Sequence, residues 1–393
     1  MGQPIRKVTK EIHPDADLKP FYTLLVDGNS LLRLCFKDKR VNSRDEHYGG
    51  VFQFLLQLKI MLKKANFDYV YVTFDDSNSG ILRYKLYNGY KANRDKNYID
   101  DSDLSEYGKA FNAKIKSMQD YLFNKNKPKR EKTDEEKFID LNFARERDIL
   151  LKYFNELYIR WFFDDVIEGD DFIAYYVNNK KKEEKIVIMT TDHDLTQLIS
   201  DSVCVYDLHD KKFIGKDNMI RLRGIPVENV MIEKVFCGDI SDNIKNINGV
   251  SKARLHELIP EIEQRPITIE EVKERAQKCI DERVQQKKKP LKWHENIVNG
   301  IPNGNYDGDF YQINKAIIDL KNPLMTEEAK KEIDSMMYNV QDTEDRSFKN
   351  LYQYIMDDDI TELIDCNNFA RFFEEFKTLA DKEILRYNEF IKK

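Results

Sequence analysis

The chain has 393 residues, with 64 lysines and arginines against 70 aspartates and glutamates, and a formal net charge of −6. This length suggests about two or three structural units. No apolar stretch approaches the roughly 18 residues of a membrane span, and no signal peptide is recognisable, so we expect neither export nor membrane insertion. The five cysteines lie scattered without CxxC spacing, which is typical of reduced thiols in a cytoplasm.

Three apolar runs in the chain are each followed directly by aspartate. They cover residues 21–26, 69–74 and 185–191, and the acids that follow them are Asp27, Asp75 with Asp76, and Asp192. Their β-branched and aromatic content, with helix-like sequence after each, indicates buried parallel strands of an α/β sheet. Since ligands bind outside the carboxyl ends of such strands, the three runs would bring acids to one place.

Further acids follow along the chain, and together they suggest a metal site. They are Glu168, Asp170 and Asp171 before an apolar segment, Asp194, and the pair Asp239 and Asp242. So many carboxylates in one cleft would repel one another unless cations bind. Oxygen ligands without a histidine or cysteine cluster favour Mg²⁺ or Mn²⁺ over zinc. Two ions would suit in-line displacement at phosphorus.

Each acid also has an ordinary structural interpretation. Aspartate just after a strand is common turn chemistry. The segment 168–171 could be only a helix N-terminus, where carboxylates complement the helix dipole, and Asp239 and Asp242 could be solvated. The ordered occurrence of all these groups favours a shared site.

A basic, helix-rich insertion separates the second and third groups of acids. It begins with bases among tyrosines, including Tyr90, Lys91 and Arg94, and a second basic run surrounds Pro128. A capping box at residues 133–136 predicts the start of a helix after that run. Two helices joined by a basic turn would form a projecting hairpin; the alternative is a solvated helical pair with a flexible charged loop.

The sequence after the last acids is predicted to be helical. Residues 246–255 connect two apolar helices and contain Gly249. A second capping box at 268–271 opens a helix that ends at the lysines 287–289. These lysines could contact nucleic acid, or residues 260–305 could serve packing alone. A loop rich in glycine, asparagine, proline and aspartate, about residues 299–309, precedes the last helices.

Six motifs in this order resemble the 5′-nuclease superfamily of flap endonucleases and 5′→3′ exonucleases, in particular phage enzymes of the T-even RNase H type. The resemblance spans about residues 20–256, and the motifs are Val26-Asp27-Gly28-Asn29, Phe74-Asp75, Tyr90-Lys91-Ala92-Asn93-Arg94, Glu168-Gly169-Asp170-Asp171, Thr191-Asp192-His193-Asp194-Leu195 and Gly238-Asp239-Ile240-Ser241-Asp242-Asn243-Ile244.

The resemblance implies an α/β fold of the PIN-like kind, with a mostly parallel central sheet, a helical arch and an all-helical C-terminal domain that contains a helix-three-turn-helix motif. We expect an N-terminal extension over residues 1–20, a nuclease domain over 21–215 with the arch at about 84–147, and a DNA-binding domain over 216–393, enlarged at about 260–305.

The resemblance also implies roles for the acids. Two Mg²⁺ ions, replaceable by Mn²⁺, would be held by two groups of ligands. The first group would be Asp27, Asp75, Glu168 and Asp170; the second would be Asp171, Asp192, Asp194 and Asp242, with Asp239 farther from the ion. Asp76 is the reserve for Asp75, because neighbouring residues of a strand point to opposite faces.

Bases in the same family contact the nucleic acid. Lys91 and Arg94 would contact the scissile phosphate, and Tyr90 would lie near the substrate end or serve as a core tyrosine. The arch would receive a 5′ single strand with the aid of Lys125, Lys127 and Lys129. The helix-three-turn-helix motif would grip duplex backbone through Gly249, Ser251, Lys252 and Arg254. The family's K⁺ site there uses glycines, of which this chain keeps only Gly249, so that site is left open.

The implied activity is metal-dependent hydrolysis of DNA or RNA–DNA duplexes at a 5′ flap, nick or primer, with removal of RNA primers during replication as the expected role. The protein would be a cytoplasmic monomer, with a single-strand-binding protein or sliding clamp as candidate partners. Alternatives are an inactive protein that binds branched DNA, a PIN-type endoribonuclease and a HAD-type phosphatase. The complete set of acids weighs against the inactive protein, and the Gly249 segment weighs against a PIN-type enzyme. A HAD-type phosphatase would need an Asp-x-Asp arrangement, which Asp27 does not provide.

Overall fold

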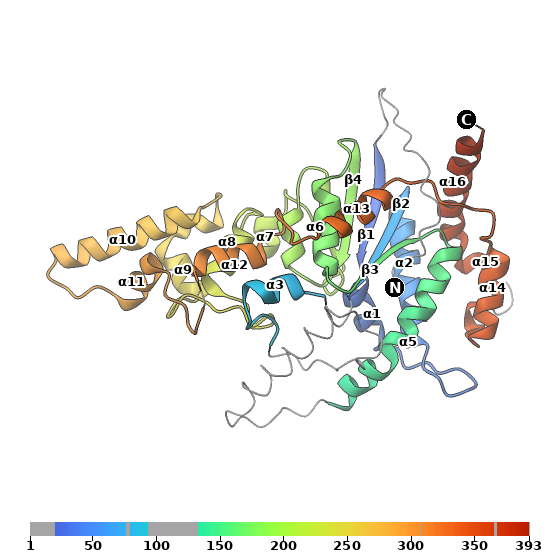
Figure 1. Cartoon of the computed structure of the whole chain (residues 1–393), viewed down its shortest axis with the longest axis horizontal. Coiled ribbons are helices and arrows are strands. Elements are labelled where there is room, and N and C mark those ends of the chain that lie inside the picture. Colours follow the sequence, from blue (N-terminus) through green and yellow to red (C-terminus); the bar gives the residue numbers. More distant parts are fainter. Residues whose placement is uncertain (1–19, 76–78, 93–132, 307, 365–367, 393) are drawn as a thin grey trace.

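A computed structural model describes residues 20–75, 79–92, 133–306, 308–364 and 368–392 of the chain (Figure 1). The N-terminal extension, most of the arch and Asp76 lie outside these residues, as do Arg94, Lys125, Lys127 and Lys129. Within the described part, none of the helices combines the length and the apolar content that a membrane span requires.

Six strands form one sheet in the order β3-β2-β1-β4-β5-β6, in which only β6 is antiparallel to its neighbour. Their bounds are β1 Phe21–Asp27, β2 Tyr69–Asp75, β3 Arg160–Asp164, β4 Glu184–Thr190, β5 Val203–Asp207 and β6 Lys212–Ile214. The α/β fold with a mostly parallel sheet is therefore confirmed, and the three predicted strands agree with β1, β2 and β4 to within one residue at each end. Because the five parallel strands run the same way, their carboxyl ends share one edge.

Helices cover both faces of the sheet, because successive strand residues point to opposite sides. Leu24 and Val26 point to the first face and Leu25 to the second. The first face is covered by α1 Gly28–Cys35, α2 Gly49–Lys64, α5 Asp134–Glu156, α14 Phe348–Asp357, η4 Thr361–Leu363, α15 Asn368–Phe372 and α16 Glu374–Ile391. The second is covered by α6 Gly169–Asn178, η2 Asp194–Leu198, α7 Met219–Arg223 and α13 Glu327–Met336.

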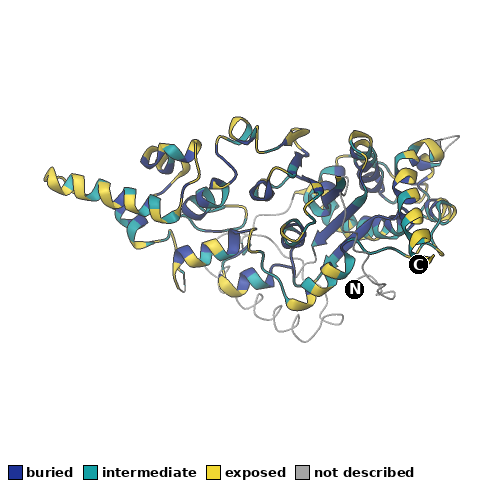
Figure 2. Cartoon of the chain, turned by 90° about the horizontal axis from the view of Figure 1, so that it is seen from above, coloured by how far each residue is buried: buried dark blue, intermediate teal, exposed yellow. Residues whose placement is uncertain are grey.

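A third hydrophobic core lies beside the sheet, on the left in Figure 1, and Tyr87 and Tyr90 from the start of the predicted arch belong to it. Short α3 Ile81–Leu86 precedes these tyrosines. The other elements here are α8 Asn229–Cys237, α9 Lys252–Leu258, η3 Pro260–Glu263, α10 Ile269–Gln285, α11 Lys292–Asn299 and α12 Phe310–Ile318. Figure 2 shows that the helix farthest from the sheet, α10, exposes much of its surface.

The expected C-terminal domain of residues 216–393 is wrong in its extent. Ile333 of α13 lies in the core of the second sheet face, and Leu351 and Phe376 of α14 and α16 lie in the core of the first. These apolar side chains bury against the sheet, so the chain returns to it after α12. We call residues 229–318, which build the third core, the helical unit.

Both capping boxes occur as predicted. The Thr133 hydroxyl accepts a hydrogen bond from the Glu136 amide at 3.2 Å, and the Glu136 carboxylate accepts one from the Thr133 amide at 2.8 Å. Thr268 and Glu271 make the same exchange at 3.1 and 2.8 Å. The boxes satisfy amides that would otherwise lack partners, and they start α5 and α10 where the sequence predicts.

Candidate metal centre and nucleic-acid interface

Acids from separate elements meet at the carboxyl edge of the sheet. Asp27 ends β1, and Asp75 ends the neighbouring strand β2. Asp75 accepts a hydrogen bond from the Gly169 amide at the start of α6, at 2.6 Å. Thr190, the last residue of β4, donates its hydroxyl to Asp27 at 2.8 Å and accepts the amide of Asp192 at 2.8 Å. These contacts hold β1, β2, β4 and α6 together around one set of carboxylates.

Burial and mutual repulsion disfavour the charged form of these carboxylates. Burial raises the pKa of Asp170 well above its usual range, and the charges of Asp192 and Asp27 raise it further. Burial also raises the pKa of Asp27 and of Asp75. In the folded protein, these groups therefore favour a bound proton or a bound cation.

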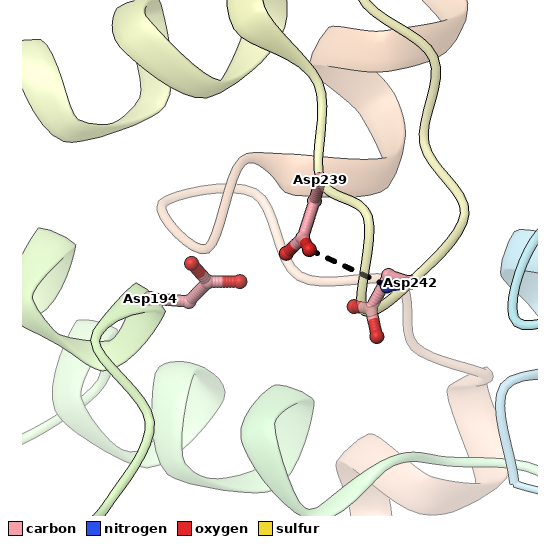
Figure 3. A group of neighbouring side chains, drawn as sticks. All are labelled: Asp194, Asp239 and Asp242. Carbon is pink, nitrogen blue, oxygen red and sulfur yellow. Dashed lines mark hydrogen bonds between the residues drawn. The ribbon is translucent and has the colours of Figure 1, made fainter.

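A second group of acids is formed by Asp194, Asp239 and Asp242, which Figure 3 shows facing one another. One carboxylate oxygen from each lies within 4.8 Å of the others, which is close to the span of oxygens around one hard cation, about 4–5 Å. Burial, followed by the charge of Asp192, raises the pKa of Asp194 to about 6. Asp194 begins η2, and the other two acids come from the loop after α8.

The donor set at this edge fits hard divalent cations, because carboxylate oxygens predominate and are close together. An additional polar atom is available beside them. The side-chain oxygen of Asn29 is buried and has no hydrogen-bond partner among the described residues, while a hydrogen bond from the Asn29 side chain lowers the pKa of Asp75. Asn29 belongs to the motif Val26-Asp27-Gly28-Asn29, but its place in the sequence alone indicates no role.

Lys234 is a functional candidate that the sequence analysis missed. Its ammonium lies 2.5 Å from Asp239 and also contacts Asp194. Burial alone would raise the pKa of Asp239, but the charge of Lys234 lowers it to about 2. Lys234 lies within a helix that was predicted from its apolar residues, and nothing local marks this lysine as facing the acids.

Glu168 is held by cations near the start of the segment predicted to form the arch. Its carboxylate accepts hydrogen bonds from Arg83 at 2.6 Å, from the Tyr90 hydroxyl at 3.0 Å and from Lys91. Although burial raises the pKa of Glu168, the charges of Lys91 and Arg83 lower it to about 2. The Lys91 ammonium therefore lies beside the acids.

The prediction that Tyr90 lies against the substrate is not supported, and the alternative of a core tyrosine fits the structure. The Tyr90 side chain is buried in the third core, and its hydroxyl is engaged by Glu168. A ring in this position has no free face for a base. Tyr90 instead positions Glu168 and packs the start of the arch onto the helical unit.

Asp171, which the resemblance assigns to the second ion, contacts Arg83 in the structure. Asp171 is only 1% exposed, and both of its oxygens contact the guanidinium of Arg83, one of them at 2.9 Å. The oxygen at that distance also accepts the amide of Leu324 at 3.0 Å. Asp171 therefore forms a buried ion pair with Arg83 of α3. Nothing in the local sequence identifies Arg83 as this partner.

The Gly249 segment forms an exposed turn before α9. Gly249 has a φ of +83°, which a residue with a side chain adopts only with strain. The Ser251 hydroxyl accepts a hydrogen bond from the Arg254 amide at 3.4 Å and so caps α9, while the Arg254 guanidinium contacts the carbonyl of Gly249. Ser251, Lys252 and Arg254 are exposed, so they are available to a ligand.

The carbonyls near this turn already accept hydrogen bonds. Asn246 donates its side-chain amide to the carbonyl of Val250 at 2.6 Å, and Asn296 donates to that of Asn248 at 2.8 Å. A cation site would need several of these carbonyls to point together at one ion. The arrangement weighs against the K⁺ site that was left open.

Comparison with known proteins identifies relatives of the chain. Residues 22–224 match the family model of the 5′-3′ exonuclease, N-terminal resolvase-like domain. DNA polymerase I of Rhizobium leguminosarum is 33% identical over 95 residues, which are 24% of this chain and 9% of the polymerase. The 5′-3′ exonuclease of Mycoplasmopsis pulmonis is 28% identical over 236 residues, 58% of this chain and 63% of that protein. The chain thus matches less than two-thirds of either relative.

Solved structures with a similar arrangement share little sequence identity with the chain. The T5 D15 protein crystallised with metal ions is 17% identical, with a TM-score of 0.49, over 86% of this chain and 98% of that one. Human GEN1 in complex with Holliday junction DNA is 12% identical, with a TM-score of 0.46, over 92% and 72% of the two chains.

Proposed function

Because the chain belongs to the family of the 5′-3′ exonuclease N-terminal, resolvase-like domain, we propose that it is a divalent-metal-dependent 5′-nuclease. It would hydrolyse phosphodiesters of DNA or of RNA–DNA duplexes from a 5′ end or at a flap junction. The observation that carries this proposal is the meeting of buried, mutually repelling carboxylates from β1, β2, α6 and the loop after β4 at the carboxyl edge of the sheet.

Two groups of acids would hold two Mg²⁺ or Mn²⁺ ions. The first comprises Asp27, Asp75, Glu168 and Asp170, and the second comprises Asp192, Asp194 and Asp242. When bound, such ions would lower the pKa of the attacking water and offset the negative charge that develops at phosphorus. Asp239, held by Lys234, would orient the second group without direct contact to the ion.

Lys91 would supply positive charge to the scissile phosphate. Its ammonium now contacts Glu168, and a phosphate entering between the acids would offer it a second anionic partner. A fixed cation at the site of developing charge is typically a large catalytic contribution. We assign the same role to Arg94, and the capture of a 5′ single strand to Lys125, Lys127 and Lys129, on the family resemblance alone.

The helical unit would bind the duplex part of the substrate. Ser251, Lys252 and Arg254, at its Gly249 turn, are exposed and carry side-chain donors of the kind that contact phosphates. The acids at the edge of the sheet would then cut the strand, while the helical unit, by binding the duplex, would set the distance from the flap junction to the cleaved bond. Removal of RNA primers during replication is the cellular role that this combination suits best.

Digestion of labelled substrates tests the proposal. A 5′ flap, a nicked duplex and an RNA-primed duplex, labelled at either end, should be cut from the 5′ side with Mg²⁺ and remain intact in excess chelator. Asp170→Asn should abolish cleavage but keep binding in Ca²⁺, whereas the matched surface change Asp201→Asn should leave both unchanged. Equal cleavage of 3′ flaps would refute the polarity, and binding without any cleavage would favour the inactive DNA-binding alternative.

A further inference from the structure

The turn between α10 and α11 carries a concentrated positive charge. Residues 283–292 include five bases and no acid, and we call this segment the basic tip. The bases are Arg283, Lys287, Lys288, Lys289 and Lys292. The four lysines are exposed, and the Arg283 guanidinium donates to the carbonyl of Lys289 at 2.9 Å.

The main chain of the basic tip is held by its own hydrogen bonds. The amide of Lys287 donates to the carbonyl of Val284 at 2.9 Å, and that of Lys288 donates to Arg283 at 2.8 Å. Lys287 has a φ of +56°, which reverses the chain after α10. The lysines therefore extend from an ordered turn whose position follows that of the two helices.

The helix that follows the basic tip is attached directly to the Gly249 turn. Asn296 of α11 donates to the carbonyl of Asn248 at 2.8 Å, and the amide of Asn248 donates to the carbonyl of Ile301 at 2.9 Å. A Cβ on Gly249 would lie 3.2 Å from the Cβ of Trp293. These contacts fix the basic tip beside the proposed duplex-binding turn, at the end of the molecule farthest from the sheet (Figure 1).

We propose that the basic tip binds the phosphate backbone of the same duplex that the Gly249 turn grips, farther from the cleaved bond. This inference rests on the proposed function. Duplex DNA carries one charge per about 1.7 Å of its axis, so a local excess of five cations matches it. Lys287 lies six residues before Trp293, which lies against Gly249, so the tip is at most about 20 Å from the Gly249 turn, or about six steps of 3.4 Å along one strand. The tip would thus lengthen the bound duplex by up to about six base pairs.

The salt dependence of binding tests this extension. Each phosphate contact contributes about 0.9 to the slope of log affinity against log salt concentration. The triple variant Lys287→Gln, Lys288→Gln, Lys289→Gln should therefore lose up to about 2.7 from the slope on a long duplex arm, measured by fluorescence anisotropy in Ca²⁺. On an arm about six base pairs shorter, the variant should bind and cut like the wild type.

The matched control is the triple change Lys349→Gln, Lys377→Gln, Lys392→Gln, at three exposed lysines in α14, in α16 and just after α16, across the sheet from the helical unit. It should leave the slope unchanged, with circular dichroism confirming that both variants are folded. An unchanged slope for the tip variant, or an equal loss on both arms, would overturn the inference. If the wild type bound the long arm with the full slope but never cut it, the nuclease proposal would fail while the tip inference stood.

Discussion

Replacement of Arg83 by methionine should lower the free energy of unfolding by about 3–5 kcal/mol, the usual cost of removing one partner from a buried ion pair. The Arg83 guanidinium donates to Glu168 at 2.6 Å, to Asp171 at 2.9 Å and to the carbonyl of Ile317 at 2.9 Å. Methionine would leave Asp171, 1% exposed, and Glu168, 4% exposed, without this cation. Arg83 also joins α3, α6 and α12, so its loss should loosen the contacts among these helices.

Urea denaturation followed by far-UV circular dichroism measures this cost. Asp171→Asn should cost less, about 1–3 kcal/mol, because Arg83 keeps its contact with Glu168 and the amide still accepts one hydrogen bond. The matched control is Arg265→Met, which breaks an exposed pair with Glu271 and should cost about 0–1 kcal/mol. A cost for Arg83→Met no greater than that of the control would refute the reasoning.

Four further predictions concern the acids at the sheet edge and the Gly249 turn. Divalent cations should raise the unfolding temperature and chelation should lower it, as calorimetry would show; no difference would contradict a metal centre. Lys234→Met should tighten Mn²⁺ binding about tenfold, about 1.4 kcal/mol, because its ammonium competes for Asp194; titration calorimetry that found weaker binding would oppose this. The pKa of Asp194 is raised to about 6 in the folded protein, so protonation of this group stabilises the folded state. This contribution is fully present below about pH 3.9, the unfolded pKa, and is lost as the pH rises through 6. The free energy of unfolding of the metal-free protein should therefore fall over this range, and it should fall less in Asp194→Asn. Lys252→Gln with Arg254→Gln should weaken all duplexes alike and reduce the salt slope by about 1 per contact.

The strands and the order of the acids were readable from the sequence because they depend on neighbouring residues. An apolar run that ends at Asp27 or Asp75 specifies a buried strand with a carboxylate at its carboxyl end, wherever the strand lies in the fold. The capping boxes at Thr133 and Thr268 are equally local, since each uses residues three positions apart. β3, β5 and β6 were not predicted, and the short Lys212–Ile214 exposes two of its three residues.

The partner of each acid was decided only by the tertiary structure. Asp170 and Asp171 are adjacent, yet one faces the acids of β1 and β4 while the other pairs with Arg83, 88 residues away. Lys234 reaches Asp194 across 40 residues, and α14 and α16 return to the sheet from the end of the chain. Such contacts depend on which faces of distant helices bury together, and apolar periodicity specifies that a helix has a buried face without specifying what covers it.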